Sequence, residues 1–142
     1  MHTRFLIVDD SEPVRQGLRK VLRANPDWEI CGEAADGLTA VEKFRDLHPQ
    51  VVILDFKMPG INGLEAARRM MEIAPDVPIV MLTQHASASL EEHAQKVGIR
   101  SVVSKTEVFS MVGMIEELLR RGDSAPNAEK PSNGGHFASE RQ

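Results

Sequence analysis

The chain has 142 residues, of which 42% are hydrophobic and 27% charged, and this composition is typical of one globular domain. Seventeen Lys and Arg against 21 Asp and Glu give a net charge of −4 without a basic cluster, which argues against direct binding of nucleic acid. The single cysteine cannot form an intrachain disulfide, and no apolar run approaches the roughly 20 residues of a membrane helix. The apolar run 5–8 is too short for a signal peptide, so we expect a cytoplasmic protein without membrane contact.

The composition changes after residue 121. The segment 122–142 is dominated by Gly, Pro, Ser and Asn and has no apolar periodicity, which is typical of a flexible tail. The part before it alternates short apolar runs with amphipathic stripes. We therefore predict one folded domain over residues 1–121 and a flexible C-terminal tail over residues 122–142.

Five segments have the pattern of strands: 5–8, 29–34, 51–54, 79–82 and 102–103. The mixed segment 29–34 fits an edge strand, whereas the continuous apolar runs of the other four are typical of central strands in a parallel sheet. Apolar residues at helical spacing lie between and after the strands, at 14–22, 38–47, 64–74, 90–97 and 108–119. Ser11 and Asp36 are candidate N-caps of the first two helices. The fourth helix has the thinnest apolar face.

This alternation predicts an α/β fold with a doubly wound, five-stranded parallel sheet and helices on both faces. In such sheets, ligands bind outside the carboxyl ends of the strands. Asp9 and Asp10 follow the first strand, Asp55 the third, Thr83 the fourth and Lys105 the fifth. We therefore expect these five polar residues to meet at one edge of the sheet.

Bringing three aspartates together is electrostatically unfavourable. Two like charges about 4 Å apart repel by roughly 4 kcal/mol at an effective dielectric of 20, and Lys105 alone cannot compensate three such pairs. Either one carboxyl group is protonated or the site holds a divalent cation. A site made of oxygen ligands favours a hard cation, so we predict Mg²⁺, with Mn²⁺ as a substitute.

A cation beside an exposed carboxylate, a hydroxyl and an ammonium group can accept a phosphoryl group. Lys105 would neutralise the phosphoryl oxygens, Thr83 would donate a hydrogen bond to one of them, and a carboxylate would attack in line. Asp9 and Asp10 form an adjacent pair suited to holding the metal. Asp55 stands alone at the end of its strand and is the acceptor candidate.

The stretches FLIVDDSEPVR, VVILDFKMPGINGLE, IVMLTQHA and VVSKTE resemble, in this order and spacing, the receiver domains of bacterial two-component response regulators. The resemblance covers residues 4–121 and implies a flavodoxin-like sheet of strand order 2-1-3-4-5. It also implies transfer of a phosphoryl group to Asp55 from a sensor histidine kinase or a phosphotransfer protein. By the same analogy Asp10, Asp55 and the backbone carbonyl of Lys57 bind Mg²⁺ directly, and Asp9 binds it through water.

Four further positions carry expectations from this resemblance. Lys57 and His85 lie two residues beyond Asp55 and Thr83, where side chains tune hydrolysis of the aspartyl phosphate. Gln84 stands where a small residue is frequent, and it narrows access to the phosphoryl group. Val102 stands where many receivers have an aromatic residue, so the usual aromatic switch cannot operate here.

The predicted function is a signalling switch. Phosphorylation of Asp55 would shift the fourth helix, fifth strand and fifth helix toward an arrangement that binds a downstream protein or a second copy of the chain. Because the acceptor is a residue of the chain itself, we predict no separate turnover substrate and do not expect an enzyme.

Two alternatives follow from the positions at which the chain departs from the commonest receiver pattern. Val102 and Gln84 favour an interaction scaffold that keeps the fold without depending on phosphorylation. The context of Lys105, followed by Thr106 rather than proline, resembles receivers that precede a helix-turn-helix module, so the chain is alternatively a receiver cut from a DNA-binding regulator. An aspartate-dependent phosphatase is disfavoured, because such enzymes need the nucleophile at the first strand, where Asp10 is followed by Ser11 and Glu12, whereas the acceptor candidate Asp55 follows the third strand. No glycine-rich motif supports a nucleotide-binding enzyme.

Overall fold

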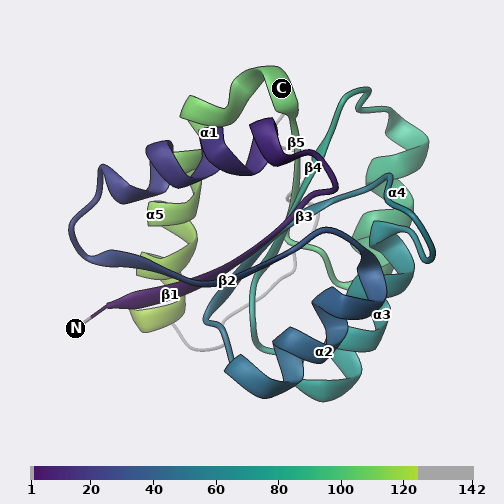
Figure 1. The fold of residues 1–142 in the computed structure, drawn as a ribbon, viewed down its shortest axis with the longest axis horizontal. Helices are drawn as coiled ribbons and strands as arrows, with labels where there is room; N and C mark the ends of the chain where they lie inside the picture. The colour runs from purple at the N-terminus through teal and green to yellow at the C-terminus, as the bar shows by residue number, and fades with distance from the viewer. Residues whose placement is uncertain (1, 125–142) are drawn as a thin grey trace.

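The computed structural model describes residues 2–124, in which five strands alternate with five α-helices (Figure 1). The elements are β1 Thr3–Val8, α1 Glu12–Arg23, β2 Trp28–Ala34, α2 Gly37–Leu47, β3 Val51–Asp55, α3 Gly63–Ile73, β4 Ile79–Thr83, α4 Ala88–Val97, β5 Ser101–Ser104 and α5 Val108–Ser124, with a 3-10 turn η1 at Lys105–Glu107. All neighbouring strands are parallel, in the order β2-β1-β3-β4-β5. The predicted fold class and strand order are confirmed.

The helices cover both faces of the sheet. Figure 1 shows α1 and α5 on one face and α2, α3 and α4 on the other. The strands β2 and β5 lie at the two edges, as the predicted strand order requires. The apolar pair Val102 and Val103 of β5 is typical of a central strand. In the five-stranded sheet, however, β5 pairs only with β4, and of the two valines only Val103 is buried.

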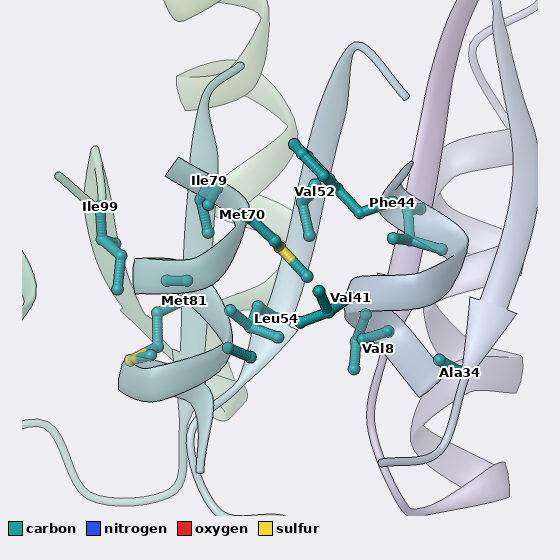
Figure 2. Close-up of a cluster of buried hydrophobic side chains, with 14 of the residues drawn as sticks. Val8, Ala34, Val41, Phe44, Val52, Leu54, Met70, Ile79, Met81 and Ile99 are labelled. Atoms are coloured by element: carbon teal, nitrogen blue, oxygen red, sulfur yellow. The ribbon is translucent and has the colours of Figure 1, made fainter. Parts of the chain in front are cut away.

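Each face of the sheet has its own apolar core. On the side of α2 and α3, Figure 2 shows Val41, Phe44 and Met70 lying over Val52 and Leu54 of β3. On the other side, the buried residues of α1 and α5 pack on the strands; the core there contains Phe5, Ile7, Leu18, Leu22, Trp28, Val51, Ile53, Val80, Leu82, Val103, Met111 and Ile115. Burial on both faces explains why β1, β3 and β4 read as continuous apolar runs.

Side-chain caps fix where several helices begin. The Ser11 hydroxyl accepts a hydrogen bond from the Val14 N–H at 3.3 Å, and Asp36 accepts one from the Thr39 N–H at 2.8 Å. Both predicted N-caps are therefore confirmed. Helix α4 buries only Leu90 and Ala94, which agrees with its predicted thin apolar face.

The C-terminal helix is longer than the sequence predicts. α5 continues to Ser124, three residues beyond the predicted boundary at 121, and the rest of the predicted tail, 125–142, lies outside the described residues. None of the helices among residues 2–124 combines the length and the apolar character that crossing a membrane requires.

The start of α3 packs directly on the end of β3. The Gly63 N–H donates to the carbonyl oxygen of Phe56 at 2.7 Å. A Cβ at Gly63 would collide with the backbone carbonyl oxygen of Asp55 and lie 2.9 Å from the Met81 side chain. Only glycine permits this close approach, which holds the backbone of Asp55 in place.

We expect Gly63→Ala to lower the free energy of unfolding by about 1–3 kcal/mol, the usual cost of overpacking. Gly113→Ala is the matched control, because a Cβ at that exposed position in α5 meets nothing within 4 Å. The control should raise stability by about 0.5–1 kcal/mol, the gain of alanine over glycine within a helix. Urea unfolding measures both. Equal stability of Gly63→Ala and the wild type would contradict the packing argument.

Candidate functional site

The three predicted aspartates meet at the carboxyl edge of the sheet. β1 and β3 are neighbours, so Asp9 and Asp10 after β1 lie close to Asp55 at the end of β3. One carboxylate oxygen from each of the three lies within 4.8 Å of the others. Asp10 is exposed, but Asp9 and Asp55 are only 0% and 3% exposed. The expectation of an exposed acceptor carboxylate is therefore wrong for Asp55, whose side chain packs beneath its neighbours.

Lys105 joins this cluster from the far edge of the sheet. It begins η1 directly after β5, and its Nζ lies 3.0 Å from Asp9 Oδ2 and 3.1 Å from Asp55 Oδ1. The ammonium group thus bridges two of the three carboxylates. One cation against three acids leaves an excess of negative charge at the site.

Burial and the excess charge both shift pKa values in the site. Burial raises the pKa of the Asp55 carboxyl, the charge of Asp9 raises it further, and Lys105 opposes both only in part. Burial alone would lower the pKa of Lys105, but its contacts with Asp9 and Asp55 outweigh burial and raise it. Lys105 is therefore held in its charged form, while the ionised form of Asp55 is disfavoured.

One buried carboxylate oxygen remains without a hydrogen bond. Asp9 Oδ1 accepts from the Ser11 N–H at 2.9 Å, whereas Asp9 Oδ2 has no hydrogen-bond partner among the described residues. Its contact with Lys105 Nζ has the distance of an ion pair but not the alignment of a hydrogen bond. A buried oxygen in this state fits a cation site, and oxygen ligands from three acids match the preferences of Mg²⁺.

Thr83, Gln84, His85 and Lys57 lie at the same end of the sheet, but no hydrogen bond or ion pair among residues 2–124 joins them to the acids. Thr83 is buried at the end of β4, and its Oγ1 accepts from the His85 N–H at 3.3 Å and lies 3.5 Å from the His85 carbonyl oxygen. Gln84, His85 and Lys57 are exposed in loops. Val102 is half-buried on β5 and packs against the core on the α2 and α3 side.

One residue that contacts the acidic cluster, Arg15, was not predicted from the sequence. Arg15 of α1 donates to the backbone carbonyl oxygen of Asp9 at 2.6 Å and to Glu33 at 3.0 Å. The signal in the sequence is weak, since Glu12 and Arg15 at i and i+3 read as an ordinary surface pair. The contact with Asp9 depends on how α1 packs beside β1 and β2.

The raised pKa of Asp55 sets the sign of a stability prediction. An acid with a raised pKa in the folded state destabilises the fold once it ionises, so the destabilisation is absent below its ordinary value of 3.8 and complete above the folded value. Without divalent metal, we expect Asp55→Asn to be more stable than the wild type at pH 7, by about 1.4 kcal/mol for each unit of the shift. The gain should disappear toward pH 3.

Thermal unfolding in a chelating buffer across this pH range measures the difference. Glu72→Gln is the matched control, because Glu72 is an exposed acid of α3 paired with Arg68, far from the cluster. A destabilised Asp55→Asn at neutral pH would contradict the electrostatic description of the site.

Longer proteins contain a segment similar in sequence to this chain. Protein-glutamate methylesterase/protein-glutamine glutaminase 1 of Methanosarcina acetivorans is 39% identical over 118 residues, which cover 82% of this chain and 34% of the relative. The transcriptional regulatory protein DegU of Brevibacillus brevis is 32% identical over 102 residues, which cover 72% of this chain and 43% of the relative. The chain thus spans less than half the length of these curated relatives.

The prediction that the chain has no separate turnover substrate and is not an enzyme is contradicted, because the first of these relatives is named as an enzyme. The matched part is about a third of that protein. The prediction was drawn from the acceptor chemistry of this matched part alone.

Solved structures agree with the fold. The response regulator domain of Thermotoga maritima CheB superposes with a TM-score of 0.77 at 30% identity, covering 89% of this chain and 100% of that domain. The sequence model of the response regulator receiver domain matches residues 5–116, a range that contains the acidic cluster and Lys105. The chain belongs to the response regulator receiver domain family of two-component signalling.

Proposed function

We propose that this chain is a phosphorylation-dependent switch whose Asp55 accepts a phosphoryl group from a sensor histidine kinase or a phosphotransfer protein in the cytoplasm. The observation that carries the proposal is the convergence of Asp9, Asp10 and Asp55 with Lys105 at the carboxyl edge of the sheet. Membership of the receiver family supports it.

Mg²⁺ is the proposed cofactor, and Mn²⁺ is expected to replace it. Asp10, Asp55 and the backbone carbonyl of Lys57 would hold the ion directly, with Asp9 acting through water. The exposure of Asp10 supports this role, since Mg²⁺ keeps several waters and needs an open side. Asp9 Oδ2, which accepts no hydrogen bond among the described residues, would accept one from that water in the bound state.

Asp55, Lys105 and Thr83 would have different roles in the transfer of the phosphoryl group. When bound, Mg²⁺ would supply positive charge beside the phosphoryl oxygens. An Asp55 carboxylate oxygen would attack phosphorus as the nitrogen–phosphorus bond of a phosphohistidine breaks, and the nitrogen would keep the electron pair. Lys105 already touches Asp55 Oδ1 and would move its ammonium group onto the incoming oxygens. Thr83 would donate a hydrogen bond from its hydroxyl, which now lies 3.5 Å from the His85 carbonyl oxygen.

The exposed side chains around the acceptor would set how long the phosphoryl group survives. Lys57, Gln84 and His85 lie in the loops after β3 and β4, and all three are exposed. We propose that they tune the access of water to the aspartyl phosphate. Val102 is half-buried on β5. Because it is not aromatic, a shift of Thr83 would not be accompanied by the usual movement of an aromatic side chain on β5.

Incubation with acetyl phosphate and Mg²⁺ tests the acceptor. We expect intact-mass analysis to find one phosphoryl adduct on the wild type and none on Asp55→Asn, because asparagine lacks the nucleophilic oxygen. Asp46→Asn is the matched control, since Asp46 is exposed on α2 away from the cluster, and it should be modified like the wild type. An unmodified wild type would favour the phosphorylation-independent scaffold. An adduct on Asp55→Asn would place the acceptor elsewhere.

The output surface is proposed to be α4, β5 and α5, which would bind a downstream protein or a second copy of the chain. Helix α4 buries only Leu90 and Ala94, so it can shift at low cost. The loop from β4 to α4 links Thr83, through its bond with the His85 N–H, to the N-cap Ser87. The names of the relatives indicate two kinds of output, methylesterase and transcriptional regulation, and the same input would serve either.

Beryllofluoride with Mg²⁺ mimics the phosphorylated aspartate and tests the switch. We expect backbone amide chemical shifts to change across residues 83–103 in the wild type and to stay constant in Asp55→Asn. Changes confined to the neighbours of Asp55, with 83–103 unaffected, would contradict a shift of α4 and β5.

A further inference from the structure

Arg15 is a half-buried side chain that no part of the proposed chemistry uses. Its side chain is 16% exposed, and all three guanidinium nitrogens donate hydrogen bonds. Nη1 donates to the backbone carbonyl oxygen of Asp9 at 2.6 Å, Nε to Glu33 Oε1 at 3.0 Å and Nη2 to Glu12 Oε1 at 2.5 Å. The guanidinium therefore ties the loop after β1 to the end of β2 and to the first turn of α1.

The bond to Asp9 falls at a point where the sheet no longer holds the chain. β1 ends at Val8, and the Asp9 N–H makes a last bond to the Ala34 carbonyl at 3.0 Å. The next peptide group connects Asp9 to Asp10, and its carbonyl oxygen is the one that Arg15 binds. The orientation of this peptide determines how the two adjacent carboxylates are presented.

Besides the ion pair with Lys105, three hydrogen bonds hold Asp9 in place. Its N–H is bound by Ala34, its carboxylate by the Ser11 N–H and its carbonyl by Arg15. Of these partners only Arg15 is a side chain, so only that contact can be removed by substitution without altering the backbone. Planar guanidinium groups suit this task, because one ammonium group cannot reproduce their fixed set of donors.

We propose that Arg15 is a positioning residue for the cation site, which it serves by fixing the peptide between Asp9 and Asp10. The inference rests on the proposed function, since it requires that this site binds Mg²⁺. It assigns to α1 a role in the phosphoryl chemistry, although no residue of α1 reaches the reacting atoms.

Electrostatics alone predicts the opposite effect of removing Arg15. A positive charge beside a cation site weakens binding of the cation, and its removal should strengthen binding. Arg19 also bonds Glu12 and Glu33, at 2.9 and 2.7 Å. The charges of the two arginines and the two glutamates therefore cancel in this network. Loss of Arg15 would leave the network with one excess negative charge. Weaker binding of Mg²⁺ in that variant would therefore report positioning rather than charge.

Titration calorimetry of metal-free protein with MgCl₂ tests the inference, using Arg15→Met, Arg15→Lys and Arg19→Met. We expect both Arg15 variants to bind Mg²⁺ about tenfold more weakly than the wild type, the usual cost of losing a group that orients a ligand. Arg19→Met is the matched control, because Arg19 shares both acidic partners but does not bond to Asp9. It should bind within about twofold of the wild type or more tightly.

Each outcome bears on the inference separately from the proposed function. If the wild type binds Mg²⁺ and both Arg15 variants bind it equally well or better, the inference is overturned and the proposed function stands. If the wild type does not bind Mg²⁺, both fail. The loss should persist at high KCl, since a change in geometry is not screened by salt. Unfolding curves in chelating buffer establish that each variant is folded, and Arg15→Lys decides the test if Arg15→Met is not.

Discussion

The functional site is dominated by one electrostatic constraint, the convergence of three carboxylates at the edge of a parallel sheet. One oxygen from each lies within 4.8 Å of the others. Parallel strands end on the same side, so the residues after β1 and at the end of β3 are brought together by topology alone. The resulting repulsion is offset in part by Lys105, which reaches both Asp9 and Asp55. The remaining negative charge supports the proposal that the site binds a hard cation and, with it, a phosphoryl group.

The rest of the fold supports this unfavourable arrangement. Apolar cores on both faces of the sheet fix the strands, and the close approach of Gly63 to the Asp55 carbonyl fixes the end of β3. On the other side of the site, Arg15 binds the Asp9 carbonyl from α1. The stability of the two cores offsets the cost of burying charge where the chemistry requires it.

Much of this organisation could be predicted from the sequence. The continuous apolar runs of β1, β3 and β4 and the caps Ser11 and Asp36 follow local rules, and the polar residues at strand ends follow from the topology. Other features depend on tertiary contacts. Val102 and Val103 read like a central strand because sequence does not reveal where a sheet ends. The burial of Asp55 and the bond from Arg15 to Asp9 arise from the packing of distant segments, as does the contact at Gly63.

Anomalous diffraction from crystals soaked in Mn²⁺ tests the central claim most directly, because Mn²⁺ replaces Mg²⁺ at oxygen sites and locates itself in the map. The account predicts one strong peak within coordination distance of Asp10 and Asp55, with Lys105 displaced from at least one carboxylate. A map without a peak at this edge of the sheet, in which Lys105 still bridges Asp9 and Asp55, would contradict it.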